Sequence, residues 1–190
     1  MNLQRRALLG AGLTLPSWPT WATANHDEAA RLLRAGRTVA VFRHAQAPGV
    51  YDPPGMRLGD CSTQRNLDDE GRAQARRLGA WFTAQGLEPL RVRSSPWCRC
   101  LDTAHGGFGR AEPWLALGSP TGASASDRST QLATLRAALA DLPARGFEVW
   151  VTHNFVIADL AGVSTASGEG VVLGAGEGGA ARLLARLPAA

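Results

Sequence analysis

The segment Val39-Ala40-Val41-Phe42-Arg43-His44 is an uninterrupted apolar run that ends in a cation and an imidazole. Apolar runs of this kind are typical of strands that are covered on both faces of a sheet. Two later runs have the same form, since residues 90–94 lead into Ser95-Pro96 and residues 148–152 lead into His153. Because ligands of open α/β sheets bind beyond the carboxyl ends of the strands, these three ends predict one cationic pocket.

Helical patterns separate the three strands. The acids Asp68, Asp69 and Glu70 precede an apolar stripe, which predicts a helix over residues 69–84. The other expected elements are a first strand over residues 38–42, helices over residues 27–35, 97–104, 129–142 and 155–160, loops over residues 47–64 and 121–129, and antiparallel strands over residues 171–173 and 181–187. This order predicts an α/β fold, a three-layer sandwich with a mainly parallel central sheet and helices on both faces.

The bulk composition suits one compact domain. The chain has 190 residues, of which 45% are hydrophobic and 19% are charged, and these values are ordinary for a globular domain. Its formal charge of +4 falls to +2 when residues 1–24 are left out, because Arg5 and Arg6 are lost without any acid. This small charge, without a basic cluster, argues against nucleic acid as a partner.

Residues 1–24 have the composition of an export signal. Gln4-Arg5-Arg6-Ala7-Leu8-Leu9 opens a short apolar stretch, and Ala22-Thr23-Ala24 is a cleavage site of small residues. The paired arginines resemble a twin-arginine signal, and an ordinary secretory signal is the alternative. Two prolines interrupt the stretch well short of a membrane span. We therefore expect a periplasmic protein that is cleaved after about Ala24, with one domain over residues 25–190 and no stable membrane insertion.

The three cysteines are Cys61, Cys98 and Cys100. In an oxidising compartment, one disulfide and one free thiol are expected. Cys98 and Cys100 lie two positions apart on different sides of a predicted helix, so we expect Cys61 to pair with one of them. Three buried free thiols are the alternative. No CxxC or HxxxH spacing occurs, so no metal site is expected.

Two histidines and two arginines at strand ends form a set that suits a phosphate group. Arginine forks bind phosphate oxygens in pairs. An imidazole whose other nitrogen is held by a hydrogen bond can attack phosphorus and carry the phosphoryl group. A second imidazole, when protonated, can neutralise charge on the equatorial oxygens. Because Arg43, Arg99 and His153 can supply the positive field, the sequence predicts this chemistry without a metal or another cofactor.

Four motifs in order resemble those of the histidine phosphatase superfamily, which includes the phosphoglycerate mutases. Arg43-His44-Ala45 resembles its Arg-His-Gly signature, and Thr152-His153 resembles its final catalytic histidine at a strand end. Residues 66–75 (Asn-Leu-Asp-Asp-Glu-Gly-Arg-Ala-Gln-Ala) resemble its Leu-x-x-x-Gly-x-x-Gln-Ala helix start. Residues 94–104 (Ser-Ser-Pro-Trp-Cys-Arg-Cys-Leu-Asp-Thr-Ala) resemble its Ser-Ser-Pro-x-x-Arg-x-x-x-Thr-Ala block. The resemblance spans most of residues 38–175 and implies a phosphoglycerate mutase-like fold.

The resemblance also implies a role for each strand-end residue. His44 would be the phosphorylated nucleophile and His153 its electrostatic partner, and both would contact phosphate. Arg43 and Arg99 would clamp the phosphate. Arg65 lies in a loop where the superfamily often brings another phosphate ligand. The Ser-Pro-Trp-Cys-Arg-Cys and Ser-Gly-Glu-Gly segments are similar to those of a small periplasmic branch, whose relatives include a lipopolysaccharide-core heptose phosphatase.

The proton donor is where the chain departs from the superfamily's patterns. The phytase-like branch has an aspartate directly after its second histidine, where this chain has Asn154. The mutase-like branch takes its acid from the segment before that histidine, where Glu112 is a candidate. Glu169, which lies between two glycines, is the other candidate and the acid that we expect. A phosphohistidine phosphatase branch works without a dedicated acid, so a missing acid would narrow the range of substrates.

The sequence thus predicts a periplasmic, metal-independent phosphatase that acts through a phosphohistidine on a phosphomonoester. Its expected partner is a phosphorylated small molecule, or a glycan or lipid of the envelope. A catalytically idle relative that binds phosphate for a ligand-binding or envelope role is the alternative. A phosphomutase is disfavoured, because phosphorylated glycolytic metabolites are scarce outside the cytoplasm.

Overall fold

The computed structural model describes residues 21–189 as alternating helices and strands. The elements are, in chain order, α1 (Trp21–Ala35), β1 (Thr38–Arg43), η1 (Cys61–Thr63), α2 (Asp69–Ala84), β2 (Arg91–Ser94), α3 (Cys98–Phe108), β3 (Glu112–Pro113), η2 (Leu115–Leu117), α4 (Ala125–Ala140), β4 (Phe147–Thr152), α5 (Asn154–Ala161), β5 (Gly170–Ala175), η3 (Glu177–Gly179) and β6 (Ala181–Leu187), where η marks a short 3₁₀ helix. No helix within these residues is both long enough and apolar enough to cross a membrane.

One six-stranded sheet runs through the molecule in the order β3-β2-β4-β1-β5-β6. The pairs β1–β4, β2–β4 and β2–β3 are parallel, whereas β5 runs antiparallel to both of its neighbours. The register places Arg43 of β1 opposite Thr152 of β4, and Ser94 of β2 opposite Val151 of β4. The carboxyl ends of these three strands therefore meet at one edge of the sheet, as the sequence predicts.

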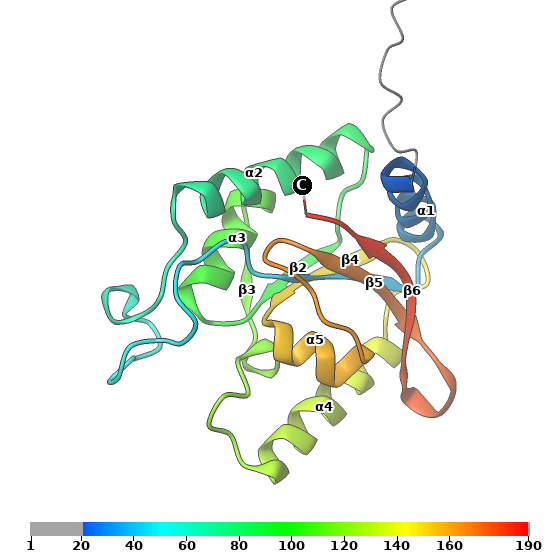
Figure 1. Cartoon of the computed structure of the whole chain (residues 1–190). Helices are drawn as coiled ribbons and strands as arrows, with labels where there is room; N and C mark the ends of the chain where they lie inside the picture. The colour runs from blue at the N-terminus through cyan, green and yellow to red at the C-terminus, as the bar shows by residue number, and fades with distance from the viewer. Residues whose placement is uncertain (1–20, 190) are drawn as a thin grey trace, which may run out of the picture.

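Helices cover both faces of this sheet (Figure 1). On one face, α1, α2 and α3 bury a cluster that includes Leu33, Phe42 and Phe82. On the other face, α4 and α5 bury a cluster that includes Leu135 and Trp150. Full burial of such side chains contributes about 1.5–3 kcal/mol each. The predicted three-layer α/β sandwich with a mainly parallel centre is confirmed, and its two cores fix the strand ends.

Some element bounds differ from those expected. The helix α3 continues to Phe108, beyond its expected end. The helix α4 begins at Ala125 because Ser124 caps it, and the Ser124 hydroxyl accepts a hydrogen bond from the Asp127 amide at 3.1 Å. Part of the loop expected there is therefore helical. The strand β3 was not predicted, since two residues at the edge of a sheet carry no periodic pattern.

The predicted export signal lies mostly outside the described residues. The helix α1 begins at Trp21, so the expected cleavage point after Ala24 falls inside this helix. Among the side chains of α1 that the structure describes, Ala29, Ala30 and Leu33 are buried in the core and Leu32 packs against it. These contacts all follow the expected cleavage point.

Candidate active site

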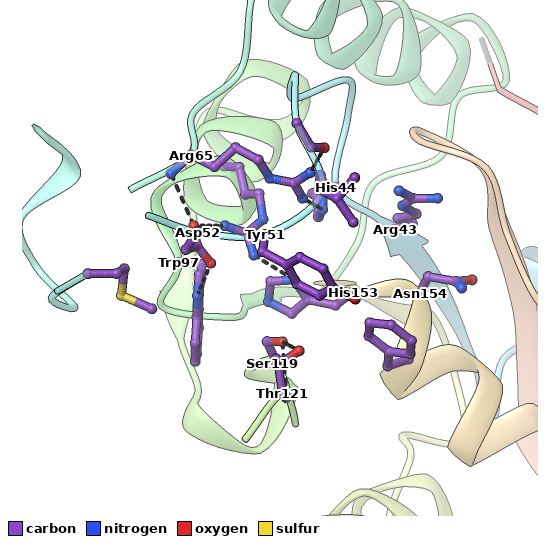
Figure 2. A pocket seen from close by; sticks show the side chains of 15 residues that line it. Arg43, His44, Tyr51, Asp52, Arg65, Trp97, Ser119, Thr121, His153 and Asn154 are labelled. Carbon is purple, nitrogen blue, oxygen red and sulfur yellow. Dashed lines mark hydrogen bonds and ion pairs between the residues drawn. The ribbon is translucent and has the colours of Figure 1, made fainter. Parts of the chain in front are cut away.

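Residues from three strand ends line one cavity of about 370 Å³. The His44 amide donates to the Thr152 carbonyl and the Ser95 amide donates to the Val151 carbonyl, both at 2.9 Å, so the strand pairing continues into the cavity wall. The structure brings both predicted histidines and all three predicted arginines into this wall. Its lining residues are Arg43, His44, Gly49, Val50, Tyr51, Asp52, Met56, Arg65, Trp97, Arg99, Ser119, Thr121, His153, Asn154 and Phe155 (Figure 2).

His44 is buried in the wall of this cavity, with 2% of its surface exposed. Its Nδ1 lies 2.8 Å from the Ala45 carbonyl oxygen. Because a carbonyl can only accept, Nδ1 carries the proton and Nε2 keeps its lone pair. A terminal nitrogen of Arg65 lies 3.5 Å from Nε2. His44 therefore presents a nucleophilic nitrogen in a fixed tautomer, next to a cation that can hold an anionic group against it.

His153 follows β4 and stands beside His44. A terminal nitrogen of Arg99, which can only donate, lies 3.4 Å from the His153 Nδ1, and the Ser95 hydroxyl lies 2.9 Å from Nε2. The rings of the two histidines meet edge to face, with their centroids 5.6 Å apart. The second imidazole is thus held between a cation and a hydroxyl, within reach of a group bound at His44.

Three guanidinium groups border the cavity, those of Arg43, Arg65 and Arg99. In each of them the Nε is buried and has no hydrogen-bond partner. Their other contacts include the Thr165 carbonyl for Arg43, at 2.9 Å, and the Gly49 carbonyl for Arg65. The three guanidinium groups line one cavity, and such a cluster of positive charge suits an anion with several acceptor oxygens.

Asp52 supplies a carboxylate to this cavity, and Figure 2 shows it with Trp97 across the cavity from Arg43. Its Oδ1 accepts from Arg99 at 2.7 Å and from the Arg65 amide at 3.0 Å, and its Oδ2 accepts from the Trp97 indole at 3.2 Å. Burial raises the pKa of Asp52, but these hydrogen bonds and the Arg99 charge outweigh burial, so the pKa lies below its usual value. Asp52 is therefore the ionised partner of Arg99.

Residues of the predicted helix-start motif hold the cavity wall together. The Gln74 side chain accepts from the Gln46 amide and donates to the Ser167 carbonyl, both at 2.9 Å. Gly71 allows the start of α2 to approach this wall, because a Cβ at that position would lie 2.0 Å from the Gln46 carbonyl oxygen. The motif thus joins the segments that follow β1 and precede β5.

Neither of the two expected proton donors belongs to the cavity wall. The Glu169 carboxylate accepts from the Ala166 amide at 2.7 Å and closes a turn, while its backbone carbonyl accepts from the Arg43 amide at 2.9 Å. The Glu112 carboxylate pairs with Arg91 at 2.9 Å on the edge strand β3. Glu169 thus lies next to Arg43, and both carboxylates have partners outside the cavity.

A disulfide joins Cys61 to Cys98, and Cys100 is a free thiol. The expectation of one disulfide and one free thiol is confirmed. The crosslink attaches the loop before α2 to the first residue of α3, next to Arg99. Burial raises the pKa of Cys100 to about 12, and its Sγ lies 3.6 Å from the His153 Nε2.

Apolar side chains surround the opening of the cavity. Val50, Tyr51 and Phe155 line the cavity and are 75%, 69% and 51% exposed. Exposed apolar groups that gather in one place often mark a binding surface. The cationic interior therefore opens to solvent through an apolar rim.

Asp52 is a functional candidate that the sequence did not single out, and Ser95 was predicted to lie at a strand end but not to contact His153. Ser95 lies in the Ser-Ser-Pro block directly after a strand, and this position was a usable signal for a partner of His153. Asp52 lies in a loop rich in proline and glycine that has no periodic pattern, so only the folded contacts identify it. Within residues 21–189, no group of three or more histidine, cysteine, aspartate or glutamate side chains is placed to hold a metal ion.

The two buried histidines predict a loss of stability in mild acid. Burial is the main cause that lowers the pKa of His44 to about 3 and that of His153 well below the usual 6.5. Since the unfolded chain then binds more protons, stability is kept above pH 6.5 and lost as the pH falls below it. Below pH 6.5, each histidine should lower the free energy of unfolding by about 1.4 kcal/mol per pH unit.

Urea unfolding over this pH range measures that slope. His44→Asn and His153→Asn should each flatten it, while His105→Asn, at an exposed position, controls for the substitution itself. An unchanged slope in both of the first two variants would contradict the neutral, buried state of these histidines.

Comparison with known proteins gives structural matches only, since the sequence matches no protein-family model and no curated protein. An open reading frame of Mycobacterium tuberculosis has a TM-score of 0.61 at 16% identity, over 80% of this chain and 97% of that chain. A mycobacterial glucosyl-3-phosphoglycerate phosphatase has a TM-score of 0.58 at 17% identity, over 80% of this chain and 100% of that chain. The protein histidine phosphatase SixA has a TM-score of 0.54 at 20% identity, over 80% of this chain and 96% of that chain. The chain therefore has the fold of the histidine phosphatases.

Proposed function

We propose that this protein is a metal-independent phosphatase that hydrolyses a phosphomonoester through a phosphohistidine at His44. One observation carries the proposal. A nucleophilic imidazole nitrogen, a second imidazole and three guanidinium groups share one cavity. This arrangement matches the needs of a phosphoryl group, which carries about two negative charges and several acceptor oxygens.

The reaction follows from the positions of these groups. The His44 Nε2 forms a bond to phosphorus as the ester P–O bond breaks, and the bonding electron pair leaves with the ester oxygen. Arg43, Arg65 and Arg99 stabilise the negative charge on the phosphoryl oxygens. Water then attacks phosphorus, the N–P bond breaks, and its electron pair returns to Nε2 as phosphate is released. His153, next to His44, donates to the same oxygens once the bound phosphoryl group takes Arg99 from its Nδ1 and its negative charge favours protonation of the ring.

The structural neighbours support this assignment by their own ligands and activities. The glucosyl-3-phosphoglycerate phosphatase is described in complexes with VO3 and with inorganic phosphate, and SixA is described in complex with tungstate. These oxyanions share the tetrahedral or trigonal oxygen arrangement of a phosphoryl group. An oxyanion is therefore the ligand that we propose for the cavity of this chain.

The organic part of the substrate would meet the apolar rim. Val50, Tyr51 and Phe155 are exposed there and gain by covering an apolar group. This favours an aryl or lipid-linked phosphomonoester among the phosphorylated small molecules, glycans and lipids of an envelope. It also makes an aryl phosphate a suitable probe.

We further propose that the protein works in the periplasm. The paired arginines before an apolar stretch in residues 1–24 and the Cys61–Cys98 disulfide both support export to an oxidising compartment. Fractionation of cells that produce the full chain tests this proposal. A protein that stays in the cytoplasm with its thiols reduced would contradict it.

The test of the activity is phosphate release from 4-nitrophenyl phosphate by the protein with EDTA present. We expect turnover, together with an acid-labile phosphoprotein when the reaction is quenched. Binding of vanadate or phosphate without turnover would instead support the alternative, a catalytically idle phosphate-binding relative. Activity that requires an added divalent metal would contradict the mechanism.

A further inference from the structure

Asp52 is the one carboxylic acid among the residues that line the cavity in the described part of the chain, residues 21–189. Its side chain is 16% exposed and pairs with Arg99, which is 4% exposed, at 2.7 Å. It also accepts hydrogen bonds from the Arg65 amide and the Trp97 indole. The carboxylate is thus held by groups that border the proposed phosphoryl site.

The loop that carries Asp52 also lines the opening of the cavity. His44 is 2% exposed at the inner wall, whereas Tyr51, the neighbour of Asp52, is 69% exposed at the rim. In an in-line displacement, the leaving oxygen points away from the attacking His44 Nε2. It therefore points from the inner wall toward the opening, where the loop that carries Asp52 lies.

A phosphoryl group and the Asp52 carboxylate compete for the same cation. One terminal nitrogen of Arg99 donates to Asp52 at 2.7 Å, and the other lies 3.4 Å from the His153 Nδ1. A phosphoryl group with about two negative charges is the stronger ligand of a guanidinium fork. Once it replaces Asp52 on Arg99, its charge opposes ionisation of the displaced carboxyl, which then takes up a proton.

We propose that Asp52 is the proton donor of this site, and that it alternates between pairing with Arg99 in the empty cavity and protonating the leaving group in the occupied one. The inference rests on the proposed phosphatase function. As the His44 Nε2–P bond forms and the P–O bond breaks, the Asp52 proton moves to the ester oxygen and a neutral alcohol leaves. The Asp52 carboxylate then takes a proton from the water that attacks the phosphohistidine, so protons balance over one turnover.

A pair of esters with different leaving groups tests the proposal. The 4-nitrophenolate of 4-nitrophenyl phosphate leaves as an anion without a proton. The leaving oxygen of benzyl phosphate must be protonated as the P–O bond breaks. Asp52→Asn should lower kcat/KM about 10²–10⁴-fold for benzyl phosphate and less than about 10-fold for 4-nitrophenyl phosphate. Asp60→Asn is the matched control, because Asp60 is an acid of the same loop that contacts only Ser62 and Arg57 through its side chain.

A second measurement separates proton donation from support of Arg99. Asp52→Asn should bind inorganic phosphate as tightly as the wild type or more tightly in calorimetry, because a competing anion is gone. If Asp52→Asn fails to fold, Asp52→Glu keeps a carboxyl group and should retain hydrolysis of benzyl phosphate within about 10-fold.

Three results would overturn the assignment. Equal losses on both esters, with phosphate binding weakened by the same factor, would make Asp52 a positioning residue for Arg99. A loss that depends on the leaving group in Glu169→Gln, but not in Asp52→Asn, would assign the acid to Glu169. Hydrolysis of neither ester by the wild type would overturn the proposed function itself, and this inference with it.

Discussion

The His44→Ala protein is expected to lose hydrolysis of 4-nitrophenyl phosphate by about 10⁴–10⁶-fold, the order found when a covalent nucleophile is removed. The physical reason is that His44 presents a lone pair at Nε2 beside the guanidinium group of Arg65, while its Nδ1 proton is donated to the Ala45 carbonyl. Steady-state kinetics with EDTA present measures the loss. Quenching in alkaline detergent, which preserves the acid-labile N–P bond, measures in parallel the phosphoprotein, which should be absent.

The matched control for this substitution is His153→Ala. It removes the second imidazole of the same cavity but leaves the His44 nitrogen in place, so the acid-labile phosphoprotein should still form, at a lower rate. Phosphate binding should survive in both variants, because the three guanidinium groups remain. A phosphoprotein in the His44→Ala protein would contradict the assignment of the nucleophile.

Removal of the disulfide is expected to have the largest effect on stability. The crosslink between Cys61 and Cys98 closes a segment with a sequence separation of 37 residues. For a loop of that length, the chain-entropy relation gives roughly 4 kcal/mol of stabilisation. At about 2–4 °C per kcal/mol for a chain of this size, Tm should fall by about 8–16 °C. Thermal unfolding of the wild type with and without a reductant measures the difference.

Two cysteine variants serve as controls for the disulfide. The double variant Cys61→Ser with Cys98→Ser should have the low Tm and should not respond to the reductant. The Cys100→Ser protein keeps the crosslink, so the reductant should still lower its Tm. Equal Tm values for the oxidised and reduced wild type would show that the crosslink adds no stability.

The sequence was sufficient for the fold and for most of the cavity, because both depend on local patterns. Three apolar runs that end in Arg43-His44, Ser95 and His153 identify buried strands, and parallel pairing brings their ends together. Arg65 was predicted only from the resemblance to the histidine phosphatases, which often bring a phosphate ligand in the loop before this helix. Each of these residues has a fixed distance along the chain from a regular element, so the element carries it to its position.

The proton donor that we propose could not be predicted in the same way. Asp52 is placed by its contacts with Arg99 and Trp97, which are distant in the sequence and lie outside the loop. Glu169 satisfied every local criterion, since glycines flank it and it follows the second histidine. Its carboxylate nevertheless accepts from the Ala166 amide, because the four-residue turn over residues 166–169 offers a donor within the same short segment.

The burial of Cys100 has a consequence for the lifetime of the folded protein. Exchange between a thiol and a disulfide needs the thiolate form of the attacking sulfur. Cys100 lies two positions from a crosslinked cysteine, yet it is fully buried and its pKa is about 12. The native packing thus keeps this sulfur protonated and inert, and the folded chain does not reshuffle its own covalent link.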